Sequence, residues 1–414
     1  MRFNMTSETK NESKTGKWVT LTVLLVSTLT VMATATITPA VPEMELYFQN
    51  IPNIQLFIRL TLSIPALAIA IGSPLVGVII DKWGRKKPLL GAAFLYGLAG
   101  SSGFYLNSLN LIFLSRIFLG LAVAGIMTIS TTLVFDYFQG RRRDTMLGYQ
   151  AAFMGFGGVI FFSFGGYLAS INWHAPFVIY IFAWVLIPGL LMLPEPKFMK
   201  NSSVIQPDQY SIVSKENRIP YSNIVFVYFL VFIFQIVFFF SIAELPFLLT
   251  NKLLLNPDLV GIVLATLTLS MGIFSILYGR LSKRISLTNI FILAFTFFGT
   301  GYFIISLALT RLEMILGLSI AGVGLGLLIP NLSRQLGKGI SQSIRGRVFS
   351  GFTSFLFLGQ FLSPLVSQIL LQFISLTELF LIGGTAMILV ALLILMKHYL
   401  IPPHKEELDA KSIV

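Results

Sequence analysis

Long runs of apolar residues, separated by short polar turns, dominate the chain from residue 18 to residue 398. A helix that crosses a bilayer needs about 20 mostly apolar residues, and about twelve runs are of that order. Very short links join several neighbouring runs, which indicates antiparallel helical hairpins. The predicted helices occupy residues 18–42, 55–80, 88–106, 109–137, 146–170, 174–193, 221–247, 258–280, 287–309, 311–337, 346–373 and 376–398.

The first run follows a polar N-terminal stretch with scattered lysines, an arrangement that a secretory signal peptide also shows. The apolar core of a signal peptide is only about 7–15 residues long. Because the run at residues 18–42 is longer, we interpret it as a retained first helix.

The composition agrees with a membrane protein and argues against several soluble classes. The chain is 55% hydrophobic and only 11% charged, whereas soluble domains carry about 25% charged residues. It contains no cysteine, which excludes a disulfide framework and a thiolate metal site. Its three histidines are scattered, so no metal cluster is expected. The net charge of +12 does not indicate nucleic-acid binding, because the basic residues gather in particular turns.

The turns between the predicted helices alternate between basic and nearly neutral. Basic residues follow the second, fourth, eighth and tenth runs and fill the central polar stretch. Loops rich in Lys and Arg face the cytosol in most membrane proteins, so we expect both termini to be cytosolic. The basic set comprises Lys82, Arg85, Lys86, Lys87, Arg141, Arg142, Arg143, Lys197, Lys200, Lys215, Arg218, Lys283, Arg284, Arg334, Lys338, Arg345 and Arg347.

The chain divides into two related halves. The longest polar stretch, residues 194–220, separates them. Gly279 follows Gly77 by 202 positions (279 − 77) in similar surroundings, and Arg345 follows Arg142 by 203 (345 − 142). Internal repeats of this kind are typical of transporters, whose substrate site lies between the repeats. We predict an N-terminal tail at 1–17, six-helix bundles at 18–193 and 221–398, a cytosolic linker at 194–220 and a C-terminal tail at 399–414.

The turn after the second predicted helix carries the motif that identifies the family. GVIIDKWGRKK, from Gly77 to Lys87, resembles the cytosolic signature of the major facilitator superfamily. LSRIFLGLAVAG around Arg116 resembles that family's fourth-helix motif, GRLSKR at 279–284 its second loop copy, and RGRVFSGF at 345–352 the start of its eleventh helix. The pattern is most similar to the twelve-helix drug/proton antiporter branch. The resemblance implies an all-α fold of two pseudo-symmetric six-helix bundles.

The chemistry of this turn fits a cytosolic gate. Gly77 permits close approach of two helices, and Gly84 permits a tight reversal. Asp81 could face a helix N-terminus, while Arg85 could form a two-pronged bond with Asp136 near the end of the fourth helix. In relatives these contacts lock the outward-open state, so the resemblance implies the same role here. Lys82 and Lys86 belong to the same motif, although Lys86 and Lys87 could serve membrane topology alone.

Two departures from the family pattern qualify this interpretation. Lys283 stands where the first copy has Asp81, so we expect the gate to be asymmetric and carried by the first half. In the fifth helix, Phe161 and Phe162 stand where antiporters often have Gly-Pro. This second departure leaves proton symport open as an alternative to antiport.

Charged residues within apolar runs are candidates for proton coupling, because a charge in hydrocarbon costs at least about 2.5–3.5 kcal/mol. Arg116 lies well inside the fourth helix, and in the family this arginine is linked to coupling. Glu244 is the only acid of the seventh predicted helix. We therefore expect Arg116 and Glu244 to act together, although Glu244, near the outer end of its helix, could instead cap the membrane interface. The acids Glu313 and Glu378 begin helices and are expected to stabilise the helix N-termini, and Glu43 and Glu45 are expected to be loop acids.

Polar and aromatic residues facing inward indicate the wall of a substrate cavity. Thr34 and Thr38 share one face of the first helix. Arg59 could face the cavity or reach to the membrane surface. The large amides of Gln235 and Gln360 need partners, and Phe238 could contact an apolar substrate.

We expect a secondary active transporter of a bacterial cytoplasmic (inner) membrane that works by alternating access. The favoured function is proton-coupled export of a small amphipathic compound: a drug, a metabolite or a siderophore-like chelator. Proton-coupled nutrient uptake is the alternative, and a non-transporting membrane sensor comes third. We expect no enzymatic activity, catalytic residue, metal or cofactor, with the proton gradient as energy source. The expected partners are the substrate, protons and lipid, without nucleic acid, and the protein is expected to be a monomer.

Overall fold

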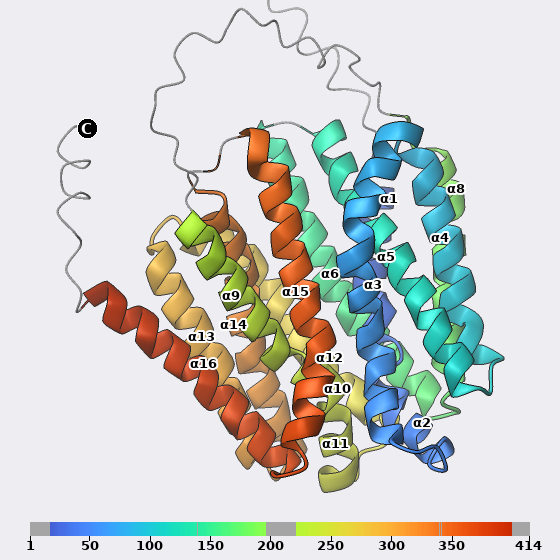
Figure 1. Ribbon diagram of the computed structural model, residues 1–414, viewed down its shortest axis with the longest axis vertical. Coiled ribbons are helices and arrows are strands. Elements are labelled where there is room, and N and C mark those ends of the chain that lie inside the picture. Colours follow the sequence, from blue (N-terminus) through green and yellow to red (C-terminus); the bar gives the residue numbers. More distant parts are fainter. Residues whose placement is uncertain (1–16, 139, 196–220, 339, 341, 400–414) are drawn as a thin grey trace, which may run out of the picture.

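The computed structural model describes residues 17–138, 140–195, 221–338, 340 and 342–399, and within these ranges it contains helices and no strand (Figure 1). Most of the predicted linker and of both predicted tails lies outside these residues, so the proposed domain boundaries remain a prediction. The first half contains α1 (Lys17–Ala35), η2 (Thr38–Ala40), α2 (Val41–Tyr47), α3 (Ile54–Trp83), α4 (Lys86–Ser101), η3 (Ser102–Phe104), α5 (Leu109–Tyr137), α6 (Gly140–Ala169), η4 (Ala175–Ile181), α7 (Phe182–Val185) and α8 (Ile187–Leu191).

The second half repeats this plan with α9 (Tyr221–Phe238), α10 (Phe240–Ala243), α11 (Leu245–Leu253), α12 (Pro257–Leu281), α13 (Leu287–Leu307), α14 (Arg311–Leu336), α15 (Gln342–Leu370) and α16 (Leu376–Tyr399). Ten segments among the described residues are long and apolar enough to cross a membrane. Two shorter segments complete the expected set: α4 with η3, and the apolar run Ala175–Leu191. The predicted helix at 109–137 coincides with α5, and the other boundaries differ by a few residues.

The first helix of each half is broken near the end of the predicted runs at 18–42 and 221–247. α1 ends at Ala35 and α9 ends at Phe238, 203 positions later (238 − 35), in agreement with the repeat. Proline lacks the N–H that a helix interior needs, and Pro39, Pro42 and Pro246 follow the breaks.

Tyrosine hydroxyls bind the main-chain oxygens that lie beside these breaks. In the first half, Tyr180 donates to the oxygen of Ala33 over 2.7 Å. In the second, Tyr302 lies 2.8 Å from the oxygen of Val237. Buried carbonyl groups without a partner are costly in an apolar environment, so these two tyrosines stabilise the broken helices.

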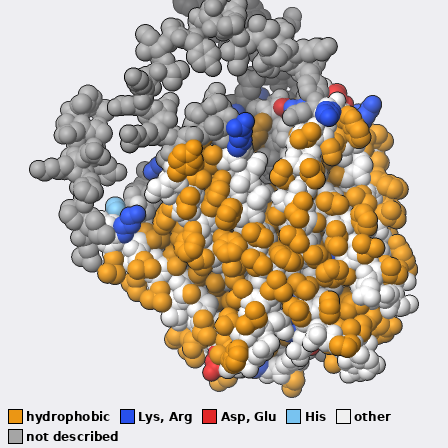
Figure 2. All heavy atoms as spheres, viewed as in Figure 1, with side chains coloured by type: hydrophobic (Ala, Val, Ile, Leu, Met, Phe, Trp, Pro, Cys, Tyr) orange, Lys and Arg blue, Asp and Glu red, His pale blue; other side chains and the backbone are white. Residues whose placement is uncertain are grey.

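The two ends of the bundle differ in charge. Figure 2 shows hydrophobic side chains over the middle of the visible face, with Lys and Arg gathered mainly toward the top. We call that end the basic end; there α3 is followed by α4, and α6 begins. The opposite end, where α2 and α11 lie in Figure 1, is the far end. The two halves meet mainly where α6 packs against α12 and where α3 packs against α15.

Candidate functional site

The basic turn between α3 and α4 has the predicted reversal. Gly84 adopts φ 79°, a conformation that glycine accepts without strain, and its N–H bonds to the oxygen of Ile80 over 3.1 Å. Arg85 Nε donates to Asp136 Oδ2 over 3.0 Å, so the expected pair forms between this turn and α5. Lys86 bonds to the oxygen of Leu191, a contact that fastens α4 to α8.

The helix contact expected at Gly77 is absent from this structure. A methyl group placed on Gly77 would meet nothing within 4 Å. The prediction of close packing at this position is therefore wrong for this conformation. The exposed side chain of Lys82 also faces away from the interior, and the side chain of Asp81 lies outside the described set. The role of the motif as a gate stays a prediction.

Arg116 is fully buried, and all its described polar partners belong to the first half. Its terminal nitrogens donate to the hydroxyl of Tyr180 over 3.1 Å and to the oxygen of Gly100 over 3.2 Å. The guanidinium carbon lies 4.8 Å from the ring centre of Phe177. The Arg116 Nε has no hydrogen-bond partner. These contacts join α5 to η4 and α4.

Arg116 and Glu244 form no ion pair with each other. Each residue has its own buried partners, because Arg116 faces the interior of the first half whereas Glu244 lies between the halves. Whether either residue couples transport to protons remains a prediction.

Arg59 and Glu244 meet at the far end, and their contact joins the two halves. Arg59 Nε on α3 donates to Glu244 Oε2, between α10 and α11, over 2.7 Å. Arg59 Nη1 donates to Glu45 Oε2 on α2, also over 2.7 Å. The side chain of Glu244 is 0% exposed, that of Arg59 6% and that of Glu45 20%. We call Glu45, Arg59 and Glu244 the far-end cluster.

Further groups hold the far-end cluster in place. Ser367 Oγ and Gln368 Nε2 on α15 donate to Glu244 Oε1 over 2.7 and 3.1 Å. Arg59 Nη1 also donates to the main-chain oxygen of Gln55 over 2.8 Å. The Arg59 guanidinium lies 3.8 Å from the ring centre of Phe247 on α11, a favourable cation–π geometry. The cluster thus connects α2 and α3 with α11 and α15.

The remaining cavity candidates line neither of the two pockets described below. Thr38 donates to the oxygen of Thr34 within its own segment. Phe238 stacks on Phe234 with ring centres 6.0 Å apart. Gln235 is buried and its Oε1 has no partner, while Gln360 is half-buried on α15. Their roles in binding remain predictions.

A cavity of about 140 Å³ opens instead within the first half, between α1, α5 and α6. Gln150 Nε2 donates to Ser27 Oγ over 2.8 Å at its wall. No charged side chain lines it, and none of the candidates named from the sequence does. Its lining consists of Ser27, Thr30, Met127, Ser130, Thr131, Leu147, Gln150, Ala151 and Met154. Sequence patterns missed these residues because small hydroxyl side chains are common in membrane helices and also bond to their own main chain.

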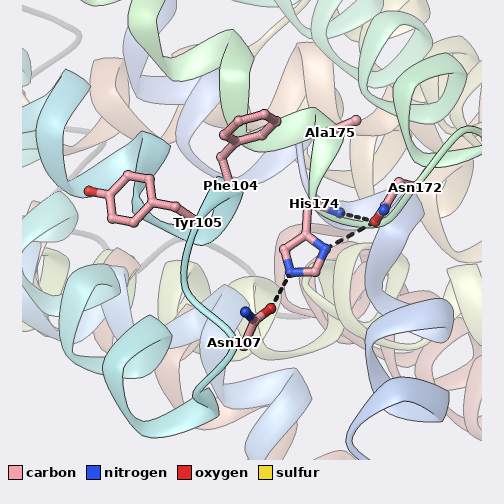
Figure 3. A pocket seen from close by; sticks show the side chains of 6 residues that line it. All are labelled: Phe104, Tyr105, Asn107, Asn172, His174 and Ala175. Carbon is pink, nitrogen blue, oxygen red and sulfur yellow. Dashed lines mark hydrogen bonds between the residues drawn. The ribbon is translucent and has the colours of Figure 1, made fainter.

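A second, shallower pocket of about 300 Å³ lies at the far end of the first half (Figure 3). His174 lies there between two amides, with Nδ1 3.0 Å from Asn172 Oδ1 and Nε2 3.1 Å from Asn107 Oδ1. Burial lowers the pKa of His174. The folded state therefore favours the neutral ring, and the stability from this preference is lost as the pH falls through the lowered pKa.

The seam between α6 and α12 is built on glycine pairs. A methyl group on Gly155 would lie 2.8 Å from the Cα of Gly272, and one on Gly166 would lie 3.0 Å from the Cα of Gly261. These helices therefore touch through their backbones over the middle and far parts of the seam. Toward the basic end, methyl groups on Gly148 and Gly279 would meet nothing within 4 Å.

Comparison with known proteins agrees with this architecture. The chain matches the Major Facilitator Superfamily over residues 23–245 and 224–413. It is 23% identical over 344 residues to the "Multi-drug resistance efflux pump PmrA" of Streptococcus pneumoniae serotype 4, covering 81% of this chain and 85% of the relative. It is 25% identical over 281 residues to a "Putative proline/betaine transporter" of Staphylococcus aureus (strain COL), covering 62% and 58%.

Among solved structures, the D-xylose-proton symporter superposes with a TM-score of 0.79 at 15% identity, over 91% of this chain and 96% of that chain. At such low identity this likeness shows the fold alone. The family match covers most of the chain. The chain therefore belongs to the major facilitator superfamily, with the fold of that family, and is a multi-pass membrane transporter rather than an enzyme.

Proposed function

We propose that this member of the major facilitator superfamily exports a small amphipathic compound, such as a drug, a metabolite or a siderophore-like chelator, in exchange for protons. The far-end cluster carries the proposal. Transporters of this architecture alternate access to a site between their halves, so the Arg59–Glu244 contact must break whenever the far end opens. Separating a buried ion pair is costly. The cost falls if a proton neutralises the carboxylate of the pair, and this links opening of the far end to protonation.

The substrate class is inferred from the cavity and from a relative. The cavity between α1, α5 and α6 combines hydroxyl and amide groups with Met127 and Met154. Methionine adapts to differently shaped apolar groups, which suits an amphipathic compound. The name of the pneumococcal relative, a multidrug efflux pump, supports export.

The proposal places the basic end in the cytosol. The basic end faces the cytosol by the distribution of Lys and Arg, and the protein lies in a bacterial cytoplasmic membrane with both termini inside. The proton gradient supplies the energy without a cofactor, since each charge that crosses 100 mV contributes about 2.3 kcal/mol. Arg85, Asp136 and Asp81 gate the basic end during the cycle, although the Arg85–Asp136 pair is also formed in the present conformation.

Proton-coupled uptake of a nutrient is the second candidate. The staphylococcal relative is named as a putative proline/betaine transporter, and Phe161 and Phe162 interrupt the glycine–proline pattern of many antiporters. Uptake would move the substrate and the proton in the same direction, which separates the two candidates experimentally.

The test is a flux measurement with the purified protein in liposomes. Ethidium, a chelator such as ferrichrome, and radiolabelled proline are each offered under an imposed pH gradient while internal pH and compound are followed. Export predicts that protons leave as ethidium or ferrichrome enters. Proline entry together with protons would replace the proposal by symport, and no proton movement with any compound would refute proton coupling for these substrates.

A matched pair of variants tests whether proton-coupled flux depends on the far-end cluster. Glu244→Gln should abolish proton-driven accumulation, because the cluster loses one of its charges, while downhill exchange persists. Glu313→Gln is the control, since Glu313 accepts main-chain N–H bonds of Leu309 and Thr310 at the start of α14. Equal loss in both variants would remove the link between the cluster and coupling.

A further inference from the structure

The cavity between α1, α5 and α6 contains buried polar groups that the protein uses only in part. Gln150 on α6 is 8% exposed and Ser27 on α1 is 1% exposed. The bond from Gln150 Nε2 to Ser27 Oγ is the one hydrogen bond of the Gln150 side chain among the described residues. The amide oxygen and the second N–H of Gln150 are therefore available. Buried polar groups usually have partners, so these two groups indicate a polar ligand.

The hydroxyl groups of the lining offer mainly acceptors. Main-chain oxygens of their own helices bind the hydroxyl protons of Ser27, Thr30 and Ser130. A hydroxyl oxygen whose proton is used in this way still has lone pairs that accept hydrogen bonds. Together with the free amide of Gln150, the cavity is complementary to a group that donates N–H or O–H bonds and accepts one in return.

A charged ligand group would find no opposite charge in this cavity. All nine lining residues are uncharged. The charged residues of the three helices are Lys17 on α1, Arg116 and Asp136 on α5, and residues 141–144 at the start of α6. Arg116 and Asp136 are engaged elsewhere, with Tyr180 and Arg85. A buried charge without a partner is expensive, whereas an uncharged amide or hydroxyl replaces its bonds to water by bonds to the lining.

The size and position of the cavity define the group that it can hold. Its volume is about 140 Å³, and an engineered protein cavity of roughly 150 Å³ binds benzene. Met127 and Met154 provide apolar contacts that adapt to a ring. Gly148 lies two residues before Gln150 on α6, and a methyl group there would meet nothing within 4 Å. The cavity therefore lies near the level at which the seam is open toward the basic end.

We propose that this cavity binds an uncharged, ring-sized end of the exported compound, an end that carries amide or hydroxyl groups, and that Gln150 selects against a cation there. The inference rests on the proposed function and narrows its substrate class. The internal repeat predicts a substrate site between the halves. The cavity adds a binding position inside the first half, where the neutral end is held.

Benzamide and the benzamidinium ion form a matched pair of probes, because they have nearly the same shape and differ by one charge. The protein is labelled with ¹³C at its methionine methyl groups and placed in nanodiscs at mildly alkaline pH, and each probe is added at millimolar concentrations. The chain contains 13 methionines, and Met127→Leu and Met154→Leu assign the two signals of the cavity. Benzamide should shift both signals saturably. It should bind at least about tenfold more tightly than benzamidinium, because the cavity leaves a cation unpaired.

A change of charge at Gln150 should reverse this preference. In Gln150→Glu, a carboxylate can form a two-pronged bond with benzamidinium. Gln372→Glu, at an exposed position after α15, is the control and should still prefer benzamide. The remaining methionine signals should keep their positions in both variants, which shows that the fold is intact. Equal affinity for the two probes in the unaltered protein, or the same preference in Gln150→Glu, would overturn the inference.

The result separates the inference from the proposed function. If neither probe shifts the signals of Met127 and Met154, the cavity holds water only and the inference is wrong. If benzamide binds as expected but the liposomes show no coupled flux, the proposed function fails and the selection for an uncharged group holds. Coupled flux without benzamide binding would refute the inference alone.

Discussion

The two ends of the seam between the halves differ, although α6 and α12 run along all of it. Gly148 lies seven residues before Gly155, and Gly279 lies seven residues after Gly272. The antiparallel register that pairs Gly155 with Gly272 therefore also places Gly148 opposite Gly279. Only the pairs in the middle and toward the far end touch. The structure is closed at the far end and separated along this seam at the basic end.

The ion pairs show the same difference. At the far end, Arg59 and Glu244 join the two halves. At the basic end, Arg85 and Asp136 join two parts of the same half. Buried ion pairs with several hydrogen bonds resist separation more than partly exposed ones. The comparison indicates that this conformation is held mainly by its far end, and that the open glycine pair is a contact of the opposite conformation.

The largest expected effect comes from linking the open glycine pair. Gly148→Cys combined with Gly279→Cys should form a disulfide only when the basic end closes, because bridged cysteines need Cα atoms about 4.4–6.8 Å apart. Oxidation should then abolish transport in liposomes, and a reducing agent should restore it. Each single cysteine variant is the control. Failure to cross-link during turnover would contradict the proposed contact.

Replacing Arg59 of the far-end cluster should have the next largest effect. Arg59→Ala leaves Glu244 buried without its ionic partner, which typically costs about 3–5 kcal/mol. We expect a lower midpoint of thermal unfolding in detergent. The distance between spin labels on cysteines introduced at Gln49 and Asn251, both exposed at the far end, should also be longer in a larger share of molecules. Arg311→Ala, at the exposed start of α14, is the control. Equal stability of both variants would show that the ion pair does not hold the far end.

A side chain on a touching glycine should have a smaller effect that depends on its position. In Gly166→Val, the first added carbon would lie 2.4 Å from the main-chain oxygen of Pro257. Overpacking typically costs about 1–3 kcal/mol, and here it should favour the open far end. In Gly148→Val, the first added carbon would meet nothing within 4 Å. This variant should therefore leave the spin-label distance across the far end unchanged in the present conformation. Similar shifts in both variants would refute the difference between the two ends.

The smallest expected effect concerns the basic turn. Arg85 and Asp136 have side chains that are 17% and 24% exposed, so Asp136→Asn should change the free energy of unfolding by about 1 kcal/mol or less. Its transport rate should fall more clearly than its stability, since the proposed gate acts during the cycle. Unfolding by denaturant and flux in liposomes measure the two effects. A loss of several kcal/mol would make the pair structural instead.

One contact of the site, the pair of Arg85 and Asp136, could be predicted from the sequence. Arg85 and Asp136 both end up at the basic end, since each lies close to the end of an apolar run. The sequence does not show the separate partners of Arg116 and Glu244, because helix rotation decides which neighbour a buried charge meets. Glu45 resembled a loop acid, and only the short helix α2 carries it back against Arg59.

The sequence alone determined the membrane environment, the order of the helices, the repeat and the family motif. Each of these depends on local chemistry: apolar runs need hydrocarbon, and charged turns need water. The tertiary structure decided the rest. Arg59 and Glu244 are 185 residues apart, and the pairs of the α6–α12 seam depend on register between halves. Such contacts arise only when two independently patterned helices pack, because periodicity fixes a helix's faces but not its neighbour.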